Sequence, residues 1–154
     1  MSSAPWAEPL APSGPPSVSA KRAGGEGWIN LETEEDLYIL GDPGEITEVF
    51  MNLAQNAAEA MGGVGALSIR ARRDAGRAII EFRDQGPGMD EDTLRHLFEP
   101  FFTTKPGKGQ GLGLCVSRAI VRNHGGEIWA ASIPGKGSTL SVALPLAPAG
   151  HRPA

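Results

Sequence analysis

The chain is organised around three neighbouring segments: DQGPGM (residues 84–89), FEPFFTTKPGKG (98–109) and QGLGLCVSR (110–118). Two glycine clusters thus bracket a loop that prolines and glycines keep from forming regular structure. Because glycine has no Cβ, backbone can approach a ligand closely there, and the free N–H groups at a helix start near Gly111 attract anions. This stretch therefore predicts a phosphate-binding loop beneath a lid.

Glycine patterns alone are weak signals in this chain. It has 21 glycines in 154 residues, roughly twice average usage, so many of them serve in turns. No GxxxxGK[ST] loop occurs, and no cluster has the G-x-G-x-x-G spacing of dinucleotide folds. Both common nucleotide-binding folds are therefore disfavoured.

Composition bounds the function further. A chain of 154 residues with 40% hydrophobic residues fits one domain with a modest core. The formal net charge of −4 argues against broad nucleic-acid binding. A single cysteine excludes an internal disulfide, and no segment has the length of a membrane span or the pattern of a signal peptide. We expect a cytoplasmic protein that is monomeric in isolation.

The two ends of the chain differ in composition from its middle. Residues 1–25 are rich in Pro, Ser, Ala and Gly and predict a disordered arm. We expect the folded domain at residues 26–146 and a frayed tail at 147–154. At the start of the domain, residues 28–40 contain two strand candidates around an acidic turn, consistent with a hairpin or with two successive edge strands.

A helix should begin after Asp42, which can act as its N-cap, with Pro43 at the first helical position and Glu45 completing a capping box. It should end at residues 62–63. A core face recurs at helical spacing, and a polar stripe about 80° wide lies on another side. The core face comprises Ile46, Val49, Phe50, Leu53, Ala57 and Ala60, and the polar stripe comprises Glu48, Asn52, Asn56 and Glu59. The stripe is either a solvated surface or part of a site.

Downstream patterns complete an α/β two-layer sandwich. ALSIRAR (66–72) and AIIEFRD (78–84), joined by the Asp74-Ala75-Gly76 turn, predict a hairpin whose second strand ends at Asp84, beside sterically open backbone. Asp90 can cap a short helix through Leu97. The helix after the lid should bury Leu112, Val116, Ala119 and Ile120 and end at residues 124–126. EIWAAS and STLSVALP predict two last strands around the IPGKG turn.

Three features then converge on a nucleotide site: paired amides on a helix, an aspartate before a glycine turn, and a glycine-rich loop entering a helix. A buried carboxylate can accept from the exocyclic amine of adenine. An amide oxygen can complete an Mg²⁺ shell alongside phosphate oxygens, and helix-start amides can hold the phosphates.

Residues 42–145 resemble the catalytic and ATP-binding domain of sensor histidine kinases, within the Bergerat-fold superfamily of topoisomerases, heat-shock chaperones and mismatch-repair ATPases. NLAQNAAEAM resembles the N box, DQGPGM the first glycine box, FEPFFTTK the F box and GQGLGL the second glycine box, in family order. The ending HGGEIWAASIPGKGSTLSVALPL also resembles the closing strands of this domain. The resemblance implies a mixed, mostly antiparallel sheet covered on one face by helices, with an ATP lid.

The resemblance also implies roles for individual residues. Asn56 would bind Mg²⁺, Asp84 would bind adenine, and Asn52 stands near the γ-phosphate where hydrolysing relatives carry glutamate, which favours phosphotransfer. Lys105 is implied as the lid contact to phosphate and as catalytic with the two asparagines, with Lys108 as the alternative. The remaining implied ATP contacts are Glu59, Gly86, Gly88, Met89, Phe98, Phe102, Thr104, Gly109, Gln110, Gly111, Leu112, Gly113 and Leu114, and Phe101 completes the F box.

Two departures from the family qualify this resemblance. Glu59 stands where many histidine kinases carry a phosphate-binding lysine, which resembles the nitrogen-regulation branch with its short lid. None of the three histidines, at positions 96, 124 and 151, lies in a phosphoacceptor-like helix, and His124 looks like a cation at a helix C-terminus. We expect no dimerisation and phosphoacceptor hairpin within this sequence, which would then be either a domain of a larger kinase or a free-standing relative acting in trans.

The resemblance therefore implies an ATP-dependent protein histidine kinase domain that is not self-sufficient. It would bind Mg-ATP and transfer the γ-phosphoryl to a histidine on a separate dimerisation domain, upstream of a response regulator. Two alternatives remain open: a nucleotide-gated interaction module, and a serine kinase of the anti-sigma type. The closing strands favour the histidine-kinase branch.

Overall fold

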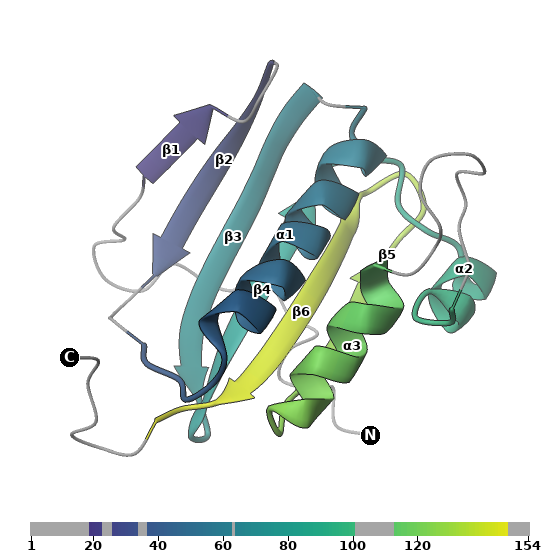
Figure 1. Ribbon diagram of the computed structural model, residues 1–154. Coiled ribbons are helices and arrows are strands. Elements are labelled where there is room, and N and C mark those ends of the chain that lie inside the picture. The colour runs from purple at the N-terminus through teal and green to yellow at the C-terminus, as the bar shows by residue number, and fades with distance from the viewer. Residues whose placement is uncertain (1–18, 23–25, 34–36, 63, 101–112, 148–154) are drawn as a thin grey trace.

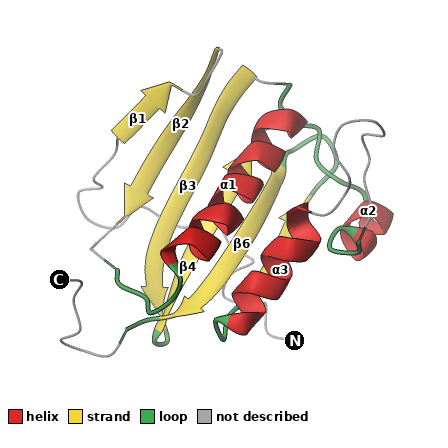
Figure 2. Ribbon diagram, viewed as in Figure 1, coloured by secondary structure: helices red, strands yellow, loops and turns green. Residues whose placement is uncertain are grey.

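The computed structural model describes residues 19–22, 26–33, 37–62, 64–100 and 113–147. Helices lie on one face of a single six-stranded sheet (Figures 1 and 2). The strands are β1 (Ser19–Arg22), β2 (Glu26–Thr33), β3 (Val64–Asp74), β4 (Arg77–Asp84), β5 (Glu127–Ser132) and β6 (Ser138–Pro145). The helices are α1 (Pro43–Ala60), α2 (Glu91–His96) and α3 (Gly113–Asn123).

The sheet is mixed and mostly antiparallel, as the sequence resemblance implied. Its strand order is β1-β2-β3-β4-β6-β5, and among these pairings β2 with β3 is the parallel one. The β3–β4 hairpin was predicted from its turn residues. Ala75 and Gly76 form its two-residue loop with φ of 52° and 79°, the positive values that a type I′ turn requires.

Of the two arrangements left open for residues 28–40, the hairpin is not formed. The first strand of that stretch, β2, pairs with β3 through eight residues. The segment after the acidic turn forms a single bridge, between Ile39 and Leu146, and Ala147 N donates to Tyr38 O at 2.7 Å. The neighbour of β2 on this side is therefore a parallel strand distant in sequence, and not the segment that follows it in the chain.

Strand β1 lies within the segment whose composition predicted a disordered arm. Ser19–Arg22 pairs antiparallel with β2, from Ser19 opposite Leu31 to Arg22 opposite Trp28. Backbone pairing to a sheet edge needs no apolar side chain, so the composition argument does not detect it. The disordered arm stays a prediction for residues 1–18 and the frayed tail for 148–154, which lie outside the described residues.

Helix α1 begins and ends where its capping residues predicted. Asp42 Oδ1 accepts from Gly44 N at 2.8 Å and from Glu45 N at 3.1 Å. Ile46, Val49, Leu53 and Ala57 form its buried face, and this predicted face packs into the core against β3, β4 and β6. None of the helices in the described part of the chain combines the length and apolar character needed to cross a membrane.

Helix α3 buries a different face from the one predicted. Its buried residues are Ser117, Ile120 and Val121, while Val116 is 38% exposed and Ala119 is exposed. Of the three predicted residues that the structure describes, only Ile120 is buried; Leu112 lies outside the described residues. The helix orientation follows from its contact with α1, which turns Ser117 inward, so apolar periodicity alone gave the wrong phase.

The side chain of His124 links the end of α3 to the start of α1. Its Nδ1 lies 2.8 Å from Ile120 O, and its Nε2 accepts from Asp42 N at 3.1 Å. Because Nδ1 must donate and Nε2 must accept, this geometry requires the neutral imidazole with its proton on Nδ1. His124 is therefore not the helix-terminal cation that its position suggested. It also occupies the backbone N–H that a Glu45 capping box would have used.

The sheet face opposite the helices carries a buried carboxylate. Glu81 on β4 pairs with Arg70 on β3, and burial raises the pKa of its carboxyl against the opposing effect of Arg83, Arg72 and Arg70. Since the folded state binds this proton more readily than the unfolded chain, the associated stability is fully present below pH 4.5 and is lost as pH rises through the raised pKa.

Replacing Glu81 by Gln should remove this pH dependence. The variant should gain in free energy of unfolding relative to the wild type as pH rises from 4.5 to 7, because glutamine stays neutral while Glu81 ionises in a desolvated position. Urea unfolding of both proteins across this range measures the difference. A stability difference that does not change with pH would contradict the assignment.

Candidate functional site

The polar stripe of α1 does not simply face solvent, because Asn52 connects α1 to α3. Its Nδ2 donates to Ser117 Oγ at 3.1 Å and to Gly113 O at 3.3 Å. Ser117 is fully buried at this contact. The first turn of α3, where the second glycine box enters the helix, is thereby held against the middle of α1. Leu114 in the same turn packs against the core.

Asn56 lies one turn further along α1. Its Nδ2 donates to Asn52 O at 2.9 Å, so the side-chain oxygen is the atom turned away from the helix backbone. Such an oxygen suits Mg²⁺, which prefers oxygen ligands and usually keeps waters and substrate phosphates in its shell. Glu59, another turn on, is exposed. No cluster of three His, Cys, Asp or Glu side chains that could hold a metal ion occurs among the described residues.

Asp84 lies at the end of β4 with its side chain on the helix-covered face. It is 6% exposed, and its Oδ1 accepts from Gly86 N at 2.8 Å. This bond folds the loop at residues 84–89 back over the strand end, as an Asx turn does. The structure thus has a buried carboxylate at the strand end, where the sequence predicted the adenine-binding acid.

The glycines of this loop meet protein backbone, which corrects the expectation of open space beside them. A Cβ at Gly86 would lie 2.9 Å from Ala60 O at the end of α1. A Cβ at Gly88, whose φ is +77°, would lie 2.3 Å from Ile133 O. Close packing against α1 and against the β5–β6 turn therefore explains both glycines without any ligand.

The loop at residues 84–89 and the turn at residues 133–137 interlock. Gly135 N donates to Pro87 O at 2.6 Å, and Met89 N donates to Ser132 Oγ at 2.7 Å. Sequence reasoning missed Ser132, Ser138 and Ser117 as contributors to the site. The sequence does show a serine on each side of the turn at residues 133–137, Ser132 and Ser138. That the two face each other depends on the register of β5 and β6, which the sequence does not show.

Two glycines of that turn provide a matched test. Both have positive φ, +82° at Gly135 and +86° at Gly137, but a Cβ meets nothing within 4 Å at Gly135 and lies 2.2 Å from Asp84 O at Gly137. We expect Gly135→Ala to cost about 1–2 kcal/mol from the backbone conformation alone. Gly137→Ala should cost at least about 3 kcal/mol, because the two loops must also separate. Urea unfolding measures both, and equal losses would refute the interlock.

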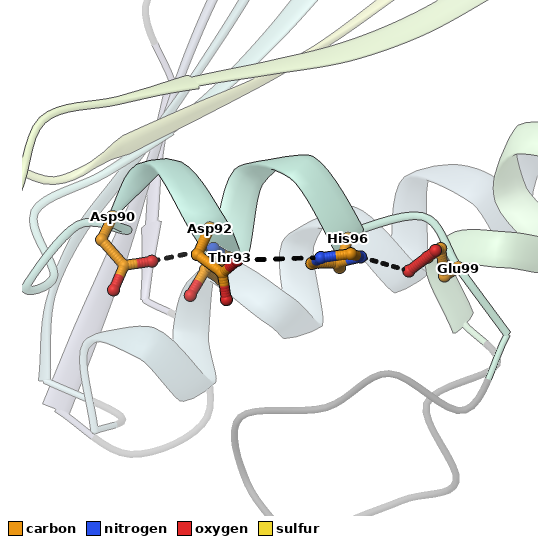
Figure 3. A network of polar contacts seen from close by, with 5 residues as sticks. All are labelled: Asp90, Asp92, Thr93, His96 and Glu99. Atoms are coloured by element: carbon orange, nitrogen blue, oxygen red, sulfur yellow. Dashed lines mark hydrogen bonds and ion pairs between the residues drawn. The ribbon is translucent and has the colours of Figure 1, made fainter.

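Helix α2 leads into the F box through a charged network (Figure 3). Asp90 caps the helix by accepting from Thr93 N at 2.8 Å, and this bond lowers the pKa of the Asp90 carboxyl. His96 lies between two carboxylates, 2.5 Å from Glu99 and 3.7 Å from Asp92. The predicted short helix is confirmed, including its cap.

Phe98 follows α2 and connects this helix to the rest of the site. It packs against the core, and the guanidinium of Arg118 on α3 lies 5.8 Å from its ring centroid. The remaining predicted lid and phosphate contacts lie outside the described residues: Phe101, Phe102, Thr104, Lys105, Lys108, Gly109, Gln110, Gly111 and Leu112.

Comparisons with known proteins agree with this geometry. Residues 41–148 match the family described as histidine kinase-, DNA gyrase B-, and HSP90-like ATPase. The chain is 44% identical over 108 residues to sensor histidine kinase ZraS of Escherichia coli, covering 70% of this chain and 23% of ZraS. It is 38% identical over 117 residues to sporulation kinase C of Bacillus subtilis, covering 76% and 27%. The chain thus spans about a quarter of these relatives.

Solved structures show the same likeness. The nucleotide-free catalytic domain of histidine kinase ThkA superimposes with a TM-score of 0.69 at 31% identity, covering 78% of each chain. Full-length ShkA in complex with AMPPNP gives a TM-score of 0.69 at 28% identity, covering 77% of this chain and 25% of ShkA. The family match over residues 41–148 and these likenesses together show that the chain belongs to the histidine kinase-, DNA gyrase B- and HSP90-like ATPases, as a catalytic ATPase domain of the sensor histidine kinase type.

Proposed function

We propose that this domain binds Mg-ATP and transfers its γ-phosphoryl to a histidine on a separate dimerisation and phosphoacceptor domain. That domain would belong to the same parent protein or act in trans, and would pass the phosphoryl on to a response regulator. The observation that carries the proposal is the buried Asp84 carboxylate, 6% exposed at the end of β4 on the helix-covered face. A carboxylate there can accept from the adenine amine.

The phosphate end of the nucleotide would lie between α1 and α3. Asn52 holds Gly113 and Ser117, so the first turn of α3 is fixed against α1 before any ligand binds. Helix-start N–H groups attract phosphate, and a fixed helix start needs little reorganisation when charge develops on the transferring group. The structure of full-length ShkA in complex with AMPPNP supports an ATP-like ligand for a relative of this fold.

Mg²⁺ would be held together with the nucleotide. The Asn56 amide nitrogen is engaged by Asn52 O, so the amide oxygen is the donor that this chain offers, and phosphate oxygens and water would supply the others. When bound, the ion would neutralise charge on the phosphate oxygens. Asn56 would orient the metal-bound phosphates relative to α3.

The chemistry of Asn52 supports phosphotransfer over hydrolysis. An amide has no proton-accepting group near neutral pH, so it cannot act as the general base that would activate a water. Both of its Nδ2 contacts are to α3, which holds the side chain in place. The γ-phosphoryl would therefore stay on ATP until another domain presents an acceptor.

The described histidines are both engaged in other contacts. His96 pairs with Glu99 and Asp92, and His124 bridges Ile120 O and Asp42 N. In-line transfer needs an acceptor nitrogen roughly 3–3.5 Å from the phosphorus, which neither engaged ring provides without losing its partners. The contacts of these two described histidines support the proposal that the acceptor lies on a separate domain.

Labelled ATP tests this function. The chain, Mg-ATP and a separate phosphoacceptor domain from its parent or neighbour should together yield acid-labile, alkali-stable phosphate on the partner and none on this chain. The yield should be low, because a covalent tether normally provides an effective concentration of about millimolar. Acid-labile label on this chain alone would contradict transfer between domains, and acid-stable label on a partner serine would favour an anti-sigma-type kinase.

A further inference from the structure

The hydroxyl of Ser132 joins the loop at residues 84–89 to the turn at residues 133–137. Ser132 Oγ, at the end of β5, accepts from Met89 N at 2.7 Å and donates to Gly137 O at 2.8 Å, and it lies 2.9 Å from Ser138 Oγ. We propose that Ser132 is a positioning residue for the base end of the nucleotide site. The inference rests on the proposed function, because it concerns how tightly the same site holds its nucleotide.

Hydrogen counting fixes the direction of each bond. A serine hydroxyl has one hydrogen and two acceptor lone pairs. The hydrogen of Ser132 goes to Gly137 O, and one lone pair receives Met89 N–H. The contact with Ser138 must then use the second lone pair, so Ser138 is the donor there and its own oxygen keeps only acceptor capacity. All bonding capacity of Ser132 is used by protein groups.

Sheet register brings this network to Asp84. Asp84 on β4 pairs with Ser138 on β6, and Ser138 pairs with Ser132 on β5. Directly paired residues of antiparallel strands carry their side chains on the same face, about 4.5–5.5 Å apart. The three side chains therefore form one row on the helix-covered face, with Ser138 between Asp84 and Ser132. Ser132 thus lies in line with the carboxylate that the proposed function assigns to the base.

The two outer side chains of this row, Asp84 and Ser132, each hold one end of the loop at residues 84–89. Its first turn is closed by Asp84 Oδ1 and Gly86 N, and its last residue is held by Ser132 and Met89 N. Removing the Ser132 hydroxyl would release Met89 N–H, Gly137 O and the Ser138 proton together. The loop would keep its bonds at Asp84 and at Pro87 O, but its last residue, Met89, would lose its hydrogen bond, and binding would have to order that residue.

Titration calorimetry with ADP on the full chain tests the proposal. Ser132→Ala should weaken ADP binding about 5- to 20-fold, the effect of losing a hydrogen bond or two from a partly buried network. Ser132→Thr keeps the hydroxyl and should stay within about 3-fold of wild type. The factor by which Mg²⁺ changes ATP affinity should remain within about 2-fold, because the metal would act at the phosphate end.

The matched control is Ser141→Ala, which removes a buried hydroxyl from the same hairpin but on the opposite sheet face, beside Glu81. It should bind ADP like wild type. Amide exchange should also show faster exchange at Met89 in Ser132→Ala only.

Three outcomes would overturn the proposal. Unchanged ADP affinity in Ser132→Ala would sink it while leaving the proposed function intact. Equal weakening by Ser132→Thr or Ser141→Ala would show general destabilisation instead of positioning. A wild-type chain that binds no adenine nucleotide would overturn the proposed function and this inference with it.

Discussion

Asp84→Asn is expected to weaken ATP binding about 5- to 150-fold, the range that follows from about 1–3 kcal/mol for a mispaired buried polar group. Asp84 Oδ1 already accepts from Gly86 N, and an asparagine could keep that bond through its own oxygen. It would then present an NH₂ group where the carboxylate has its second oxygen. Two donors would face each other at the adenine amine, so the loss should fall on binding and not on folding.

Glu81→Gln is the matched control for this change, because it neutralises another buried carboxylate of β4 on the opposite sheet face. It should leave ATP affinity unchanged. The wild type should also prefer ATP to GTP, since guanine places a carbonyl where adenine has its amine. Calorimetry gives all three comparisons, and equal ATP affinity of wild type and Asp84→Asn would remove Asp84 from the site.

Features encoded by adjacent residues were predicted well from the sequence. The cap at Asp42, the cap at Asp90 and the hairpin turn at Ala75 and Gly76 all occur in the structure. Each depends on contacts within a few residues, which local sequence determines. The end of α3 belongs to the same group: Gly125 has φ of 79°, and Gly126 N donates to Val121 O at 2.9 Å, as in a Schellman cap.

Features that depend on distant partners were missed. The phase of α3 is set by Asn52, whose bond to Ser117 turns a serine inward and leaves Val116 exposed. Parallel pairing of β2 with β3 crosses the whole of α1. No window of the sequence contains both partners of either contact, so periodicity could not reveal them.

In the candidate site, too, features set by adjacent residues could be predicted and features set by distant partners could not. Its residue types could be predicted, because a carboxylate before a glycine turn and amides one helical turn apart have recognisable chemistry. The sequence could not show why residues 86 and 88 are glycines. Gly86 packs against Ala60 and Gly88 against Ile133, and each of these partners is distant in sequence. The row from Asp84 through Ser138 to Ser132 likewise exists only once three strands are in register.

Asn56→Ala is expected to reduce phosphoryl transfer to the partner domain at least about 100-fold, the scale of losing one preorganised electrostatic contact in a transfer site. The side chain lies on the polar stripe away from the buried face of α1, which is formed by residues such as Leu53 and Ala57. Among the described residues, its side chain forms one hydrogen bond, to Asn52 O within the same helix. Alanine favours helix, so the fold should persist.

The measurement pairs transfer rates with Mg²⁺-titrated ATP binding and a thermal melt. Asn56→Ala should melt near the wild-type temperature and lose most of the Mg²⁺ dependence of ATP affinity. Gln55→Ala, an exposed change one residue earlier on α1, is the matched control and should retain both Mg²⁺ dependence and transfer. The proposed metal site draws one amide oxygen from the described part of this chain, that of Asn56. An unchanged Mg²⁺ dependence in Asn56→Ala would therefore refute the metal role outright.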